Sequence, residues 1–196
     1  MNRSTRQRLV QGFAGDERAC YDPTMFKAAV VTISDSRSAG SKEDRSGPAA
    51  AEVISSLGVE VVERRLTPDE AEQIADCIRS LIGRVNLIVT TGGTGIGPRD
   101  VTPEAIGPLL DRELPGFGEI MRTGGYAKTP MFDRTPLSIL SRGGAGVIGQ
   151  TLVVMLPGSV SGVRMGLELV GPAIRHALGV LTRTVTDCSA PAQGHE

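Results

Sequence analysis

Residues 87–105 read Leu-Ile-Val-Thr-Thr-Gly-Gly-Thr-Gly-Ile-Gly-Pro-Arg-Asp-Val-Thr-Pro-Glu-Ala. The apolar run from Leu87 to Val89 ends in hydroxyls and a glycine cluster, and a new helix is expected to begin at Thr102-Pro103-Glu104. This order predicts a buried strand, a loop rich in backbone N–H groups and a helix N-terminus, with Arg99 and Asp100 between loop and helix. Such a loop suits phosphate groups, and a carboxylate beside it suits the Mg²⁺ ion that accompanies them.

The spacing of the glycines in 92–97 excludes two common nucleotide motifs. It matches neither the dinucleotide-binding pattern G-x-G-x-x-G nor the P-loop pattern G-x-x-x-x-G-K-[ST]. An ordinary strand-to-helix turn would account for two glycines. Four glycines within six residues, with a threonine hydroxyl among them, favour phosphate contact over turn chemistry alone.

The composition is that of a globular protein with many turns. A length of 196 residues predicts one domain, and 40% hydrophobic and 22% charged residues are ordinary values. The 25 glycines are nearly double the usual share of about 7%, which indicates tight turns and close backbone approaches. A net charge of −1 and only 3% aromatic residues give no reason to expect nucleic acid or a membrane surface as partner.

The cysteines and histidines of the sequence do not form patterns typical of disulfide, metal or catalytic sites. The three cysteines are far apart and show no C-x-x-C spacing, so neither a disulfide framework nor a zinc site is indicated, and a cytoplasmic location is expected. His176 lies in a helical stretch and is interpreted as structural, and His195 is close to the end of the sequence. Triads and histidine–metal sites therefore lack their central residue. The sequence also shows no 18-residue apolar stretch and no signal-peptide core.

Apolar runs and helical periodicities alternate along the chain. The expected strands cover 28–33, 59–66, 85–90 and 151–156, the second being more polar and nearer an edge. One helix is expected after Gly47-Pro48, and a second is expected at 71–82, behind a capping box at Thr67-Pro68-Asp69-Glu70. Further helices are expected at 102–111 and 117–122. The last is a long C-terminal segment that Pro172 kinks or restarts. Residues 26–183 are expected to form the domain, and 1–25 and 184–196 are expected to be poorly ordered tails.

This alternation predicts an α/β fold, a three-layer sandwich whose mainly parallel sheet is covered by helices on both faces. In such sheets ligands bind beyond the carboxyl ends of the strands. Four loops fall at that edge, which predicts a single site: Ser34-Asp35-Ser36-Arg37, Pro68-Asp69, Gly92 to Asp100, and Pro157-Gly158-Ser159.

Spacing alone leaves two readings for the polar residues of this edge. Asp69 is expected in the first turn of its helix, where the helix dipole favours a carboxylate by about 0.3–1 kcal/mol. Asp100 precedes the expected N-cap Thr102 and could simply brace the loop. Arg99 reads equally as a surface charge, and Ser141-Arg142 as an ordinary loop dipeptide.

Five segments between residues 27 and 182 occur in the order of one known family: 90–95 (Thr-Thr-Gly-Gly-Thr-Gly), 98–105 (Pro-Arg-Asp-Val-Thr-Pro-Glu-Ala), 114–122 (Leu-Pro-Gly-Phe-Gly-Glu-Ile-Met-Arg), 140–142 (Leu-Ser-Arg) and 156–158 (Leu-Pro-Gly). They resemble the molybdopterin adenylyltransferase family of molybdenum cofactor synthesis, the MogA/MoaB type. The resemblance implies the same three-layer α/β fold and a homotrimer. It also implies the transfer of AMP from Mg-ATP to molybdopterin with release of pyrophosphate. It also implies a partner protein that inserts the metal. Residues 123–136 fit the pattern less clearly.

The resemblance also assigns residues. It matches Asp69 and Asp100 to the family's essential aspartates, expected to hold Mg²⁺, and Ser141 to its pterin-side serine. The Asp-x-Ser-Gly-Pro segment of the family matches residues 44–48. The substrate-binding surface is expected to comprise Ser34, Asp35, Thr91, Gly92, Gly93, Thr94, Gly95, Arg99, Arg142, Pro157, Gly158 and Ser159.

These assignments suit the implied chemistry. The terminal phosphate of molybdopterin is already anionic, so no general base is required, and catalysis depends on alignment and neutralisation of charge. We expect the N–H groups of Gly92 to Gly95 to cradle phosphates, and Arg99 or Arg142 to offset charge. Two alternatives remain: a carrier that binds molybdopterin without adenylylating it, and a regulatory nucleotide-binding domain without a pterin.

Overall fold

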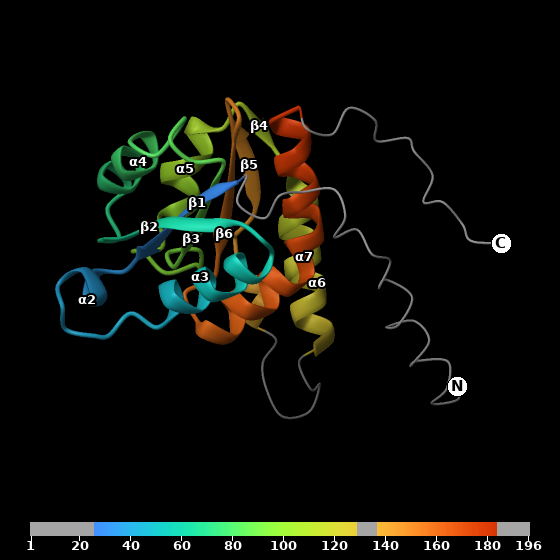
Figure 1. Cartoon of the computed structure of the whole chain (residues 1–196). Coiled ribbons are helices and arrows are strands. Elements are labelled where there is room, and N and C mark those ends of the chain that lie inside the picture. The colour runs from blue at the N-terminus through green and yellow to red at the C-terminus, as the bar shows by residue number, and fades with distance from the viewer. Residues whose placement is uncertain (1–25, 129–136, 184–196) are drawn as a thin grey trace, which may run out of the picture.

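The computed structural model describes residues 26–128 and 137–183 (Figure 1). The strands in this part are β1 (Lys27–Ile33), β2 (Glu60–Thr67), β3 (Leu87–Thr91), β4 (Arg112–Glu113), β5 (Ala145–Ile148) and β6 (Thr151–Leu156). The helices are α2 (Asp35–Ser38), α3 (Ser46–Ser56), α4 (Ala71–Arg79), α5 (Thr102–Ile106), α6 (Pro115–Lys128) and α7 (Val160–Leu181), with 3-10 turns η2 (Gly107–Leu109) and η3 (Leu137–Leu140). None of these helices is both long and apolar enough to cross a membrane.

The strands form one mixed sheet in the order β2-β1-β3-β6-β5-β4. The four strands from β2 to β6 run parallel, and β5 and β4 each pair antiparallel to their neighbour. The prediction of a mainly parallel sheet is confirmed, and β2 lies at an edge as its polar pattern indicated. Strands β4 and β5 were not predicted.

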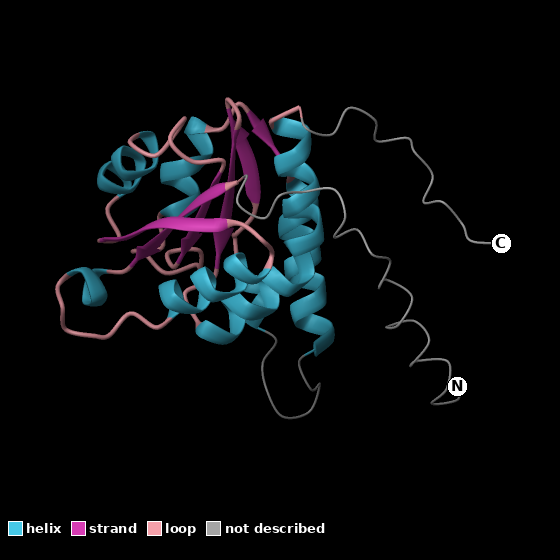
Figure 2. Ribbon diagram, viewed as in Figure 1, coloured by secondary structure: helices cyan, strands magenta, loops and turns pink. Residues whose placement is uncertain are grey.

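Helices cover both faces of this sheet, which makes three layers (Figures 1 and 2). Alternate residues of a strand point to opposite faces, and β1 shows this clearly. Ala28 and Val30 pack in a core with α3, α6 and α7, whereas Ala29 and Val31 pack in a second core with α4 and α5. The parallel strands are therefore buried on both sides, and their polar chemistry is confined to their ends.

The connection from β2 to α4 differs from the prediction. β2 continues through Thr67, which pairs with Ile33 of β1, so Thr67 cannot cap a helix. The N-cap of α4 is Glu70, and its side chain makes no capping hydrogen bond. The predicted capping box is therefore wrong, and Asp69 lies before the helix rather than in its first turn.

Three other helices differ in extent or in their start. Thr102 is the first residue of α5 rather than its N-cap, and a 3-10 turn ends this segment at Leu109 instead of Asp111. The helix expected at 117–122 extends over Pro115–Lys128. α7 is one continuous helix with Pro172 inside it, so Pro172 does not restart the segment.

Candidate active site

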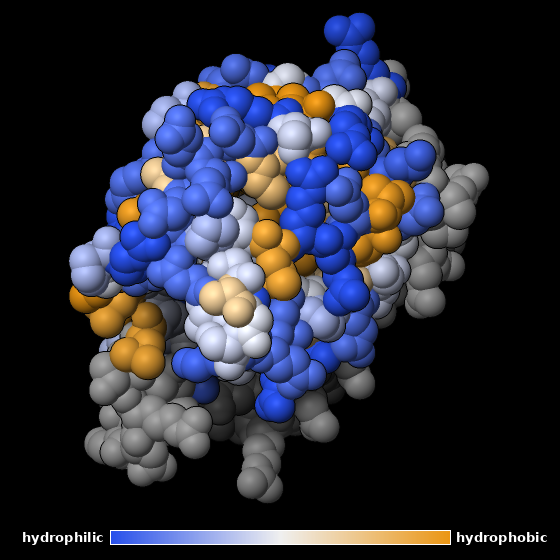
Figure 3. Space-filling model, turned by 90° about the vertical axis from the view of Figure 1, so that its left-hand side faces the viewer, coloured by the Kyte–Doolittle hydropathy of each residue, from blue (hydrophilic) through white to orange (hydrophobic). Residues whose placement is uncertain are grey.

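The carboxyl ends of the parallel strands surround a cavity of about 550 Å³. On the side of the molecule that carries α2 and α4, the surface is largely hydrophilic with small, separate hydrophobic areas (Figure 3). Of the residues singled out from the sequence, these line the cavity: Ser34, Asp69, Gly92, Gly93, Thr94, Gly95, Asp100, Ser141, Pro157, Gly158 and Ser159. The four others, Asp35, Thr91, Arg99 and Arg142, are described by the structure but are not among the lining residues.

The glycine loop is held tightly at its start. Gly92 and Gly93 adopt φ angles of 108° and 61°, which favour glycine. A Cβ on Gly92 would lie 2.1 Å from the Ile33 carbonyl oxygen, and one on Gly93 would lie 2.3 Å from Thr102 Oγ1. The Thr102 hydroxyl donates to the Gly92 carbonyl over 2.9 Å. The packing of the loop by itself therefore requires glycine at both positions.

One donor of the expected phosphate cradle is already in use. The Gly92 N–H donates to the Leu156 carbonyl over 3.1 Å, so it continues the sheet instead of facing a ligand. Thr91 also has a structural role, because its buried hydroxyl donates to the Pro157 carbonyl over 2.8 Å. These bonds join the ends of β3 and β6, and they leave the loop from Gly93 onward as the part that can contact phosphate.

Asp69 is positioned by a reciprocal pair of hydrogen bonds with Asp35. The Asp35 N–H donates to Asp69 Oδ2 over 2.8 Å, and the Asp69 N–H donates to Asp35 Oδ1 over 3.0 Å. Burial raises the pKa of the Asp69 carboxyl, and the negative charges of Asp35 and Asp100 raise it further. Asp69 is thus a partly desolvated carboxylate aimed at the cavity, whereas Asp35 lies behind it as support.

Arg99 ties together the loops that follow β1, β2 and β3. Its guanidinium donates to Asp35 at 3.1 Å and 3.0 Å and to Glu70 Oε1 at 2.7 Å. The hydrogen bond from Arg99 holds the pKa of the Asp35 carboxyl below its usual value. Its charge is shared between two carboxylates, so Arg99 holds these loops together at the wall of the cavity.

Asp100 faces the cavity from the other end of the glycine loop. Its Oδ2 accepts the Gly97 N–H over 2.8 Å, and a Cβ on Gly95 would lie 2.7 Å from the same oxygen. No group of three or more His, Cys, Asp or Glu able to hold a metal is found within residues 26–128 and 137–183. Mg²⁺ characteristically takes only one or two carboxylates and completes its shell with phosphate oxygens and water. Asp69 and Asp100 fit that donor set.

The segment around Ser141 closes the opposite wall. The Arg142 N–H donates to the Thr94 carbonyl over 2.7 Å, and the hydroxyls of Ser141 and Thr94 lie 3.3 Å apart. The Arg142 guanidinium donates to the Gly95 carbonyl over 2.7 Å and pairs with Glu104, which lowers the pKa of that carboxyl. Arg142 therefore holds the glycine loop in place, and its charge, like that of Arg99, is balanced by a carboxylate partner.

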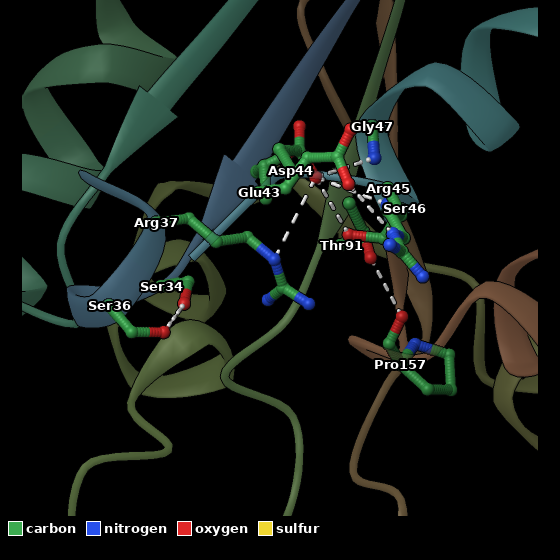
Figure 4. A network of polar contacts seen from close by, with 11 residues as sticks. Ser34, Ser36, Arg37, Glu43, Asp44, Arg45, Ser46, Gly47, Thr91 and Pro157 are labelled. Carbon is green, nitrogen blue, oxygen red and sulfur yellow. Dashed lines mark hydrogen bonds and ion pairs between the residues drawn. The ribbon is translucent and has the colours of Figure 1, made fainter. Parts of the chain in front are cut away.

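Several lining residues had no role in the sequence analysis. Arg37 was named only as part of a loop, and it contributes the guanidinium that Figure 4 shows beside Ser34. The other additional lining residues are Ile33, Ile96, Gly97, Leu137 and Leu140. Ile96, Leu137 and Leu140 are exposed hydrophobic side chains, which supply an apolar lip. No local pattern distinguishes them, because each is set by where a loop returns to the sheet.

Comparisons with known proteins identify a family whose sequences are similar to this chain. Residues 29–176 match a family described as a probable molybdopterin binding domain. A molybdopterin adenylyltransferase of Pyrococcus furiosus is 39% identical over 160 residues, which is 80% of this chain and 91% of that protein. A molybdenum cofactor biosynthesis bifunctional protein of Chlorobaculum tepidum is 42% identical over 156 residues, and the match spans only 48% of its length.

Solved structures agree with the sequence matches. A crystal structure of the molybdopterin biosynthesis enzyme MoaB from Thermus thermophilus superposes with a TM-score of 0.73 at 44% identity, covering 81% of this chain and 98% of that one. A structure of MogA gives a TM-score of 0.72 at 35% identity, covering 79% and 99%. Because the family match spans residues 29–176 and the structural matches cover about four fifths of the chain, this chain belongs to the molybdopterin-binding domain family of the MoaB and MogA type.

Proposed function

We propose that this chain is a molybdopterin adenylyltransferase, which joins AMP from Mg-ATP to the terminal phosphate of molybdopterin and releases pyrophosphate. The observation that carries the proposal is the convergence of Asp69 and Asp100 on one cavity beside the glycine loop and Ser141. The name of the Pyrococcus furiosus relative supports the same reaction. Two carboxylates beside a phosphate-sized loop suit nucleotidyl transfer, since this chemistry needs aligned phosphates and neutralised charge.

Each residue has a defined part in this reaction. Asp100 and Asp69 hold Mg²⁺, which neutralises charge on the phosphates of ATP. The reciprocal hydrogen bonds with Asp35 keep the Asp69 carboxylate oriented toward the cavity. The backbone of Gly93 to Gly95 contacts phosphate oxygens, and Ser141 binds the pterin side. The attacking phosphate is already anionic, so the absence of a histidine among the lining residues is consistent with the reaction.

The finer features of this role are part of the proposal. The family resemblance supports a cytoplasmic homotrimer built from residues 26–183, which passes its product to a protein that inserts the metal. The Chlorobaculum tepidum relative is named bifunctional and is about twice as long as the matched region. Light scattering on the purified chain tests the trimer directly, and a monomeric mass would contradict it.

The main alternative is a carrier that binds molybdopterin without adenylylating it. Two carboxylates that converge on the cavity weigh against a carrier, because binding a polyanion does not benefit from added negative charge. The match to a family described as a probable molybdopterin binding domain argues against a regulatory nucleotide-binding domain that takes no pterin.

Pyrophosphate release from Mg-ATP, measured with and without molybdopterin, separates these functions. The adenylyltransferase releases pyrophosphate only when both substrates are present. Binding of molybdopterin without release would support the carrier and contradict our proposal. Binding of ATP without any binding of molybdopterin would support the regulatory domain.

A further inference from the structure

Arg37 is the only basic residue that lines the cavity in the part of the chain that the structure describes. It extends from the short helix α2, and its guanidinium lies between Ser34 and Ser36 on one side and Thr91 and Pro157 on the other (Figure 4). The Arg37 side chain is only 24% exposed. A cation is therefore held at the wall of the cavity, largely withdrawn from bulk water.

The Arg37 guanidinium lacks the hydrogen bonds that a buried group normally has. Its Nε is inaccessible to solvent and has no hydrogen-bond partner among residues 26–128 and 137–183. The Asp44 carboxylate is 3.9 Å away from Nε, which allows an ion pair but exceeds hydrogen-bond distance. A guanidinium carries five N–H donors, and buried polar groups are almost always satisfied in native structures. Nε is closed off from the cavity, but the terminal nitrogens of Arg37 make no hydrogen bond within the described residues, and they are available to an acceptor that enters the cavity.

Asp44 orients Arg37 without satisfying it. Its Oδ1 accepts the N–H groups of Ser46 over 3.1 Å and Gly47 over 3.0 Å, and its Oδ2 accepts the Thr32 hydroxyl over 2.9 Å. Gly47 packs so closely that a Cβ there would lie 2.4 Å from Asp44 Oδ2. The carboxylate is thus fixed at the start of α3 and cannot move toward the guanidinium.

The charges of the cavity make this cation important for an anionic ligand. Asp69 and Asp100 both line the cavity and repel phosphate in the absence of a metal. Arg99 and Arg142 are paired with carboxylates and do not line it. A guanidinium fork matches the geometry of phosphate oxygens, and such charge-assisted bonds are the strong ones.

We infer that Arg37 binds a phosphate group of a substrate at the α2 end of the cavity. The inference rests on the proposed function for the identity of that substrate, because molybdopterin and ATP both carry phosphate. Arg37 then compensates the charge of one phosphate group, while the metal held by the two aspartates serves the phosphates of ATP. In this account, the negative charges of the two phosphate-bearing substrates are neutralised in two ways, by the Arg37 guanidinium and by the metal ion.

Calorimetric titrations of Arg37→Gln with Mg-ATP, molybdopterin and adenosine test this role. We expect about 10- to 100-fold weaker binding of the phosphorylated compound that Arg37 contacts, and unchanged binding of adenosine, which has no phosphate. The compound whose affinity falls identifies the substrate. Arg45→Gln is the matched control, because Arg45 lies nearby, is 76% exposed and pairs with Glu43, and it should bind as the unmodified protein does.

Equal binding of both phosphorylated compounds by Arg37→Gln and the unmodified protein would overturn the inference. An equal loss of affinity for adenosine would also overturn the inference, because it would indicate that the substitution changes the shape of the cavity and does not remove a contact with phosphate. If Arg37→Gln does not fold, Arg37→Lys decides: loss of the bidentate geometry predicts about fivefold weaker binding, and unchanged affinity contradicts it. Arg37-dependent binding without pyrophosphate release would keep this inference and reject the adenylyltransferase.

Discussion

The rim of the cavity and its interior use charge in opposite ways. On the rim, Arg99 pairs with Asp35 and Glu70, and Arg142 pairs with Glu104. In the interior, the carboxylates of Asp69 and Asp100 face one space, and the guanidinium of Arg37 makes no hydrogen bond within the described residues. Hydrogen-bonded ion pairs at the rim hold the loops in place, whereas no such pair engages Asp69, Asp100 or Arg37 within the described residues. Interior substitutions should therefore change activity, and rim substitutions should change stability and alignment.

Asp69→Asn should give a large effect on activity with little cost to the fold. With Asp69 in its proposed role as a Mg²⁺ ligand, loss of its charge should lower turnover by about 100-fold or more. The pKa of Asp69 is raised in the folded protein, so its ionised form opposes folding at neutral pH. The amide oxygen can still accept the Asp35 N–H, and the melting temperature should stay the same or rise.

The control for this variant is Asp76→Asn, on the exposed side of α4, where the carboxylate pairs with Arg79 at the surface. Turnover and thermal melting are measured for both proteins. A clear fall in melting temperature for Asp69→Asn with nearly normal turnover would show that Asp69 belongs with the structural charges of the rim.

Arg99→Gln should give an intermediate effect. The three loops lose their common cation, so Asp69 is positioned less well, and we expect turnover to fall by about tenfold through kcat more than through KM. The ion pairs are exposed, and the melting temperature should fall by no more than about 4 °C.

Arg79→Gln provides the comparison for this rim substitution, because it removes an equally exposed ion pair that lies away from the cavity. It should leave turnover unchanged. A large rise in KM for ATP or molybdopterin in Arg99→Gln, with kcat retained, would mean that Arg99 contacts substrate directly.

Acid should produce the smallest effect, and it should act through the rim. The pKa values of Asp35 and Glu104 are lowered in the folded protein by hydrogen bonds from Arg99 and Arg142. Such carboxyls stabilise the fold above their unfolded pKa values, and this contribution is lost as the pH falls through the lower folded values. Asp69, with its raised pKa, acts in the opposite direction and offsets part of the loss.

Melting temperatures between pH 7 and pH 3.5 measure this contribution, and the fall below about pH 4.5 should be shallower in Arg99→Gln than in the unmodified protein. An identical pH dependence in the two proteins would show that the pair of Arg99 and Asp35 contributes nothing to stability.

The sequence allowed the sheet edge and most of the cavity to be predicted, because these depend on where apolar runs end. The runs at 28–33, 85–90 and 151–156 are followed by Ser34, Thr91-Gly92 and Pro157-Gly158, and these positions lie in or next to the loops of the site. Strands β4 and β5 escaped prediction because one has two residues and the other follows a pair of glycines that read as a loop. The capping box failed because pairing with β1 kept Thr67 in the sheet, a long-range contact without a local signal.

The roles of the arginines could not be predicted from the sequence. Arg99 and Arg142 stand in recognisable motifs, but their partners lie 29 to 64 residues away in the chain. Arg37 stands among serines in a loop without periodicity, and its state depends on Asp44 being occupied by the start of α3. Tertiary contacts alone decide which guanidinium forms hydrogen-bonded ion pairs, as Arg99 and Arg142 do, and which lies 3.9 Å from its carboxylate, as Arg37 does.

A titration of Mg²⁺ in the pyrophosphate-release assay, with molybdopterin present, tests the central role of the interior carboxylates most directly. It compares the unmodified protein with Asp100→Asn. We predict a saturable dependence on Mg²⁺ for the unmodified protein and no turnover at any Mg²⁺ concentration for the variant, with the same fold and oligomeric state in both. Nearly normal turnover of Asp100→Asn at saturating Mg²⁺ would contradict the account.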